Sequence, residues 1–124
     1  MKKAVSTDKA PSAPSIYSQA IENGNLVFLS GQVHLTPDGE LVEGSFKDKV
    51  DQIMNNLQTV LEEAELGFED VVKVTVFLTN MEDYQRFNEI YVQYFDEPFP
   101  AREAVCVKAL PLGAIIEISM IASK

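Results

Sequence analysis

The sequence predicts a single α+β domain in which two helices pack on one face of a mixed six-stranded sheet. Three observations predict it: a length of 124 residues, several strand-like runs rich in β-branched residues, and two helical patterns between them. The elements follow in the order hairpin, helix, strand, helix, strand, strand, which suits one sheet covered by both helices. With 46% hydrophobic residues the chain can form one core, so residues 1–124 are expected to be one domain.

The N-terminal third predicts an arm followed by short strands. Residues 1–14 are expected to be extended, because Pro11 and Pro14 disfavour regular ladders. Two pairs of strands, each joined by a turn containing Gly, are expected at 17–21 with 26–30 and at 33–35 with 41–42.

Two helices and three further strands are predicted in the rest of the chain. Ser45 and Asp48 form a capping-box pattern, so the first helix is expected to begin there and to end near Gly67. The second is expected over 82–95. The strands are expected at 71–79, 102–108 and 114–122, and the alternation in the first of them places Val72 on the same face as Val74. The short connection between the last two predicts that they pair antiparallel.

Apolar side chains are expected on both faces of this sheet. Phe77, Ile115 and Ile121 lie on the side opposite their strand neighbours, and two helices cannot cover both faces. The sequence therefore predicts self-association.

Charge and composition argue against several classes of protein. The net charge of −9 would repel a phosphate backbone, so nucleic acid is not expected as a partner. The N-terminus lacks the apolar run of a signal peptide, and the apolar stretches are too short to span a membrane. One cysteine, Cys106, allows no internal disulfide, which fits a cytoplasmic protein.

Glu117 and Arg102 are the leading candidates for chemistry. Glu117 interrupts an otherwise apolar strand, and a carboxylate buried there needs a cation, a proton or a wet pocket. Arg102 opens the preceding strand. One interpretation is a structural ion pair between the two residues. The other is a binding site in which the Arg102 guanidinium forms a bidentate bond with a ligand carboxylate while Glu117 positions a water or moves a proton.

Other polar residues carry weaker signals. Asn88 lies on the aromatic face of the second helix and needs partners, and Tyr17 is expected to pack half-buried at the start of the first strand. His34 is expected to be solvated and Cys106 to be buried packing. No phosphate loop or metal-spaced cluster is present in the sequence.

Several blocks together resemble the RidA/YjgF family. They are Tyr17-Ser18-Gln19-Ala20, Phe28-Leu29-Ser30-Gly31-Gln32, Asn56-Leu57, residues 71–78, Phe87-Asn88-Glu89-Ile90-Tyr91, Pro100-Ala101-Arg102, Leu110-Pro111 and Glu117-Ile118. Each block is short, but their joint order and spacing are specific.

The resemblance implies a chorismate-mutase-like fold and a homotrimeric barrel with sites between subunits. It implies hydrolysis of 2-enamino and 2-imino acids such as 2-aminoacrylate to 2-keto acids and ammonia, without cofactor or metal. By position, Arg102 would anchor the substrate carboxylate and Glu117 would hold the attacking water or assist proton transfer. The pocket or loop-bracing residues would be Tyr17, Ser30, Gly31, Tyr84 and Asn88.

One departure and three alternatives bear on this expectation. Ser15-Ile16 stands where many deaminases of the family have Gly-Pro, which puts substrate choice in doubt. A binding module for keto acids or amino acids would need Arg102 but not Glu117. A ribonuclease is disfavoured by the net charge, and a purely structural protein would use the two residues as an internal ion pair.

Overall fold

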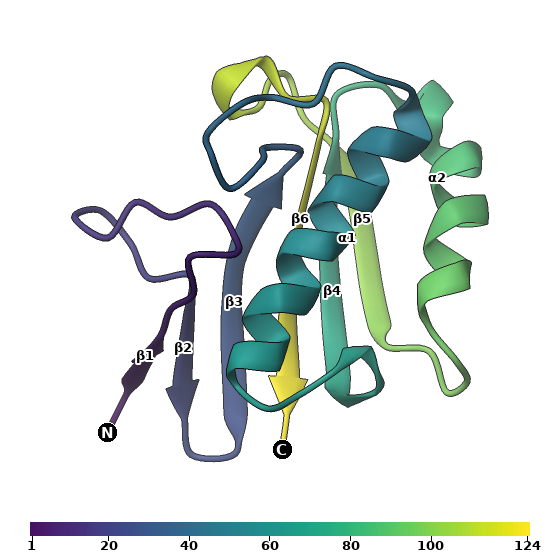
Figure 1. Ribbon diagram of the computed structural model, residues 1–124. Helices are drawn as coiled ribbons and strands as arrows, with labels where there is room; N and C mark the ends of the chain where they lie inside the picture. Colours follow the sequence, from purple (N-terminus) through teal and green to yellow (C-terminus); the bar gives the residue numbers. More distant parts are fainter.

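Six strands form one mixed sheet in the computed structural model, which describes residues 1–124 (Figure 1). The strands are β1 (Lys3–Val5), β2 (Ala20–Asn23), β3 (Leu26–Val33), β4 (Val71–Leu78), β5 (Ala101–Cys106) and β6 (Ile116–Ser123). Their order in the sheet is β1-β2-β3-β6-β4-β5, and β4 and β5 are the one parallel pair. Helices α1 (Phe46–Glu63) and α2 (Tyr84–Tyr91) cover the same face, so the predicted layers are confirmed.

The N-terminal hairpin is confirmed, but its strands are shifted. β2 begins at Ala20 and not at Tyr17, and Gly24 occupies the turn with φ of 63°. The sixth strand is β1, inside the arm that was expected to lack a ladder; it pairs with β2 well before the two prolines. The buried Gln19 side chain then holds the rest of the arm by bonding to the backbone of Thr7, Ala10 and Pro11. The predicted pairing of 33–35 with 41–42 is reduced to one bridge.

Both helices form for the reasons that the sequence indicates. The Ser45 side chain accepts a hydrogen bond from the Asp48 backbone N–H, and the Asp48 carboxylate accepts one from the Ser45 backbone N–H. The α-helical part of α2 is shorter than expected, because its ends at Met81–Asp83 and Val92–Tyr94 are 3₁₀ turns.

A β-bulge changes the face of one predicted core residue. The register of β4 against β6 shifts between Val71 and Lys73. Val71 is therefore buried, whereas Val72 is 46% exposed, which corrects the expectation that Val72 shares a face with Val74.

The predicted antiparallel pairing of the last two strands is wrong. β6 lies between β3 and β4, and β5 lies at the edge, parallel to β4. The reason is that β4, α2 and β5 form a β-α-β crossover, which brings β5 back beside β4 and leaves the centre of the sheet to β6.

The sheet face away from the helices exposes apolar side chains. Register places Phe28 of β3, Phe77 of β4 and Val105 of β5 on this open face, and Phe28 and Val105 are 42% and 43% exposed. No helix in residues 1–124 is long and apolar enough to cross a membrane.

Candidate active site

Arg102 lies on an aromatic surface formed by α2. Its guanidinium carbon is 4.8 Å from the centroid of the Tyr91 ring and 5.7 Å from those of Tyr84 and Phe87. One terminal nitrogen donates a hydrogen bond to the Tyr84 hydroxyl at 3.1 Å. Arg102 forms no salt bridge, although the chain carries nineteen acidic residues. Cation–π contacts thus hold a guanidinium whose other donors have no partner in the chain.

Two buried polar atoms on α2 also have no partner. They are Oδ1 of Asn88 and the hydroxyl of Tyr91, a residue that is only 4% exposed. Burial raises the pKa of Tyr91, and the nearby Arg102 charge opposes that shift. The predicted residues Tyr84 and Arg102 therefore come together, with Tyr91 in addition, and Asn88 lies on the same helix, four residues after Tyr84 and three before Tyr91. Its helical spacing from Tyr84 and Asn88 is the signal in the sequence that could have found it.

Glu117 lies on the open face, in the middle of the sheet. Across the ladders it is opposite Val33 of β3 and Phe77 of β4. Burial raises the pKa of its carboxyl, and no salt bridge compensates. Gly31 gives the carboxyl its room, because a Cβ at that residue would lie 2.4 Å from Oε2 of Glu117.

Ser30 connects Gly31 to the loop that carries Tyr17. The Ser30 hydroxyl donates to the Ser18 carbonyl at 2.6 Å, and the Ser30 N–H donates to the Gln19 carbonyl at 2.9 Å. Tyr17 itself is 45% exposed, and it lies in the loop before β2 and not at the start of a strand as predicted. Ser30 thus braces the loop that presents this ring.

The predicted residues fall into two groups on opposite faces of the sheet. We call Tyr84, Asn88, Tyr91 and Arg102 the arginine half-site, and Tyr17, Ser30, Gly31 and Glu117 the glutamate half-site. Arg102 pairs with Val74, which faces the helices, whereas Glu117 pairs with Phe77, three residues along β4 on the open face. Strand spacing puts their Cα atoms roughly 14 Å apart. The internal ion pair considered above is therefore wrong for a single chain.

Two other expectations are corrected. His34 is 1% exposed and not solvated, because its ring bonds to backbone groups of two loops. Cys106 is exposed and not buried, because β5 is an edge strand.

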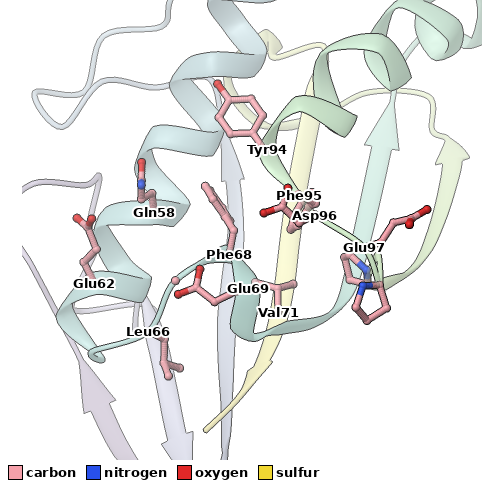
Figure 2. Close-up of a pocket in the computed structure, with 13 residues that line it drawn as sticks. Gln58, Glu62, Leu66, Phe68, Glu69, Val71, Tyr94, Phe95, Asp96 and Glu97 are labelled. Carbon is pink, nitrogen blue, oxygen red and sulfur yellow. The ribbon is translucent and has the colours of Figure 1, made fainter.

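A hollow of about 540 Å³ lies beside α1, away from both half-sites (Figure 2). Figure 2 shows Glu62, Glu69, Asp96 and Glu97 around it, with Phe68 between them. None of its lining residues belongs to either half-site. No group of three His, Cys, Asp or Glu side chains in the chain is placed to hold a metal.

The chain is similar in sequence and structure to proteins of one known family. The family described as endoribonuclease L-PSP matches residues 7–124. A chloroplastic Reactive Intermediate Deaminase A of Arabidopsis thaliana is 46% identical over 123 residues, which are 98% of this chain and 66% of that protein. The crystal structure of RidA from Psychrobacter superposes with a TM-score of 0.93 at 43% identity, covering 98% of this chain and 99% of that one. TdcF of E. coli, solved with bound serine, gives 0.91 at 35% identity, with 98% of each chain covered.

Proposed function

The chain belongs to the endoribonuclease L-PSP family, which includes the Rid proteins, and we propose that it hydrolyses 2-enamino and 2-imino acids to 2-keto acids and ammonia. A substrate such as 2-aminoacrylate carries a carboxylate beside the reacting carbon. The relative from Arabidopsis that is named a reactive intermediate deaminase supports this reaction. We place the activity in the cytoplasm, where an unpaired exposed cysteine is stable.

The proposal rests mainly on the guanidinium of Arg102, which forms no salt bridge and donates one hydrogen bond, to Tyr84. A charge held by aromatic faces, with donors free, is suited to a bidentate bond with a substrate carboxylate. Such a bond fixes the position of the imine carbon, and fixing two reactants relative to one another removes much of the entropic barrier.

Glu117 supplies the proton transfers in this proposal. The enamine first tautomerises to the imine, and a water then attacks the imine carbon while Glu117 accepts a proton from it. Protonation of the nitrogen lets the C–N bond break, ammonia leaves, and the remaining hydroxyl loses its proton to form the keto group. The raised pKa of Glu117 suits it to both directions of transfer. The reaction needs neither metal nor cofactor.

A complete site in this proposal requires a second copy of the chain. One copy presents its arginine half-site and its neighbour presents the glutamate half-site, since the two lie on opposite faces of one sheet. The apolar open face is suited to the association, and we propose the homotrimer that the family resemblance implies.

The direct test is keto-acid formation from 2-aminoacrylate that a dehydratase generates in the assay. Arg102→Gln and Glu117→Gln should each reduce the rate above spontaneous hydrolysis by at least about 100-fold. Matched controls are Arg86→Gln and Glu103→Gln, which remove the same charges from ion pairs outside both half-sites. If the wild type adds nothing to the spontaneous rate, the deaminase proposal is wrong.

Mixing the two inactive variants tests the shared site. If each site takes one half-site from each of two copies, random assembly after unfolding and refolding together restores about a quarter of the sites. A mixture that stays inactive would contradict a site built from two copies.

The second candidate is a binding module for amino acids or keto acids, which the TdcF structure with bound serine favours. It predicts that Arg102→Gln abolishes binding of serine or pyruvate in calorimetry, whereas Glu117→Gln leaves both binding and function intact.

A further inference from the structure

His34 is a buried histidine that joins two loops far apart in the sequence. Its Nδ1 lies 2.9 Å from the Val42 carbonyl oxygen, and the Ile115 N–H donates to its Nε2 at 3.0 Å. A carbonyl only accepts and an N–H only donates, so these partners require the neutral ring with its proton on Nδ1.

The Ile115 end of this bridge lies directly before the strand that carries Glu117. The Ile115 carbonyl accepts a hydrogen bond from the Thr79 N–H at 3.1 Å, so both backbone groups of Ile115 are held from outside β6. Val33, the residue before His34, is opposite Glu117 across the β3–β6 ladder. The ring thus joins the end of β3 to the start of β6, two residues from Glu117.

We propose that His34 is a positioning residue for Glu117 and that uptake of a proton by its ring releases the start of β6 and lowers the rate of hydrolysis. The catalytic part of this inference rests on the proposed function, whereas the release of β6 does not.

The chemistry of the ring gives the direction of the effect. An imidazolium carries a proton on both nitrogens, so Nε2 can no longer accept from the Ile115 N–H, and two donors then face each other. Burial lowers the pKa of His34 below its ordinary value, and the Lys49 charge on α1 acts in the same direction, whereas the hydrogen bond to Val42 and the Glu43 charge oppose the shift. The bridge is therefore intact at neutral pH and is lost when acid protonates the ring.

Two substitutions separate the two hydrogen bonds of the ring. The amide oxygen of His34→Gln reaches the position of Nε2 and can accept from Ile115, but it does not titrate. The amide of His34→Asn reaches the position of Nδ1 and keeps only the bond to Val42. Both variants are neutral and polar, so each is the control for the other.

The first measurement is the pH profile of kcat and KM between about pH 5 and pH 8. Two groups lower kcat in acid, because Glu117 must be ionised to accept a proton and His34 must be neutral to hold Ile115. The wild type should therefore lose kcat more steeply in acid than His34→Gln, in which only Glu117 still titrates, with KM little changed. His34→Gln should keep kcat within about threefold at pH 8, and His34→Asn should have a reduced kcat throughout. An acid limb with the same midpoint and steepness in His34→Gln as in the wild type overturns the catalytic part.

The second measurement needs no enzymatic activity. The protection factor of the Ile115 amide against hydrogen exchange is compared with the titration of the His34 ring, both by NMR of the folded wild-type protein. Loss of protection as the ring titrates supports the proposal even if the protein hydrolyses no imine. Protection that persists while the ring becomes charged overturns it.

Discussion

Gly31→Ala should reduce activity strongly while leaving the fold intact. A Cβ at Gly31 would lie 2.4 Å from Oε2 and 2.9 Å from Cδ of Glu117. An ordinary contact is about 3.4 Å or more, so the carboxyl must move by about 1 Å. Displacements of about 1 Å in an active site can cost on the order of 100-fold in rate. Because the displaced atoms end a flexible side chain, the free energy of unfolding should fall by less than about 1 kcal/mol.

The assay is keto-acid formation above the spontaneous rate, with thermal unfolding measured on the same samples. Gly44→Ala is the matched control, because a Cβ there would meet the Asp48 carboxylate at 2.6 Å and disturb no half-site residue. We expect a decrease of about 10- to 100-fold for Gly31→Ala and unchanged activity for the control. Wild-type activity in a folded Gly31→Ala protein would refute the role given to the position of the Glu117 carboxyl.

Three further predictions concern charge. Arg102→Lys keeps the charge but loses the planar donor pair. In steady-state kinetics, kcat/KM for the imine should therefore fall by about 10- to 100-fold, chiefly through a higher KM. An unchanged KM would contradict the bidentate role of the guanidinium. Glu117→Gln should raise the free energy of unfolding at pH 7 by up to about 1 kcal/mol in urea titrations, because burial disfavours the charged carboxyl. A less stable variant would contradict the expected cost of burying this charge. The stability of the wild type should decline as pH falls below about 6.5, since the unfolded chain takes up the proton that buried His34 resists; a decline of equal slope in His34→Gln would assign it to other groups.

The sequence predicted those elements well that depend on residues close together in the chain. The capping box at Ser45 and the apolar spacing after it determine α1, and Gly24 with its positive φ determines the hairpin turn. The bulge after Val71 was not predictable, because it depends on how β4 meets β6. His34 was misplaced for a similar reason: its burial comes from Val42 and Ile115, and the latter is 81 residues away in the sequence.

The predicted order of the strands was wrong, although it followed a general rule about short connections. Strands joined by a short connection are usually neighbours, but β5 and β6 are not. The pattern strand, helix, strand from Val71 to Cys106 also predicts a parallel β-α-β unit, and here that competing rule decided the result. All residues of the two half-sites except Tyr91 were nonetheless named from the sequence, because their identity does not depend on strand order. Their separation into two half-sites does depend on it.

This separation has a physical consequence for both charged groups. Had β5 and β6 been neighbours, Arg102 and Glu117 could have formed a salt bridge, which would occupy the guanidinium donors and lower the pKa of the carboxyl. Instead, aromatic rings hold the arginine without neutralising it, and the glutamate stays unpaired with a raised pKa. Each group therefore keeps the property that the proposed reaction needs. The arginine keeps free donors for a carboxylate, and the glutamate keeps a raised pKa that helps it both to accept and to return a proton. The central position of β6 in the sheet is thus the feature of the fold on which the proposed chemistry most depends.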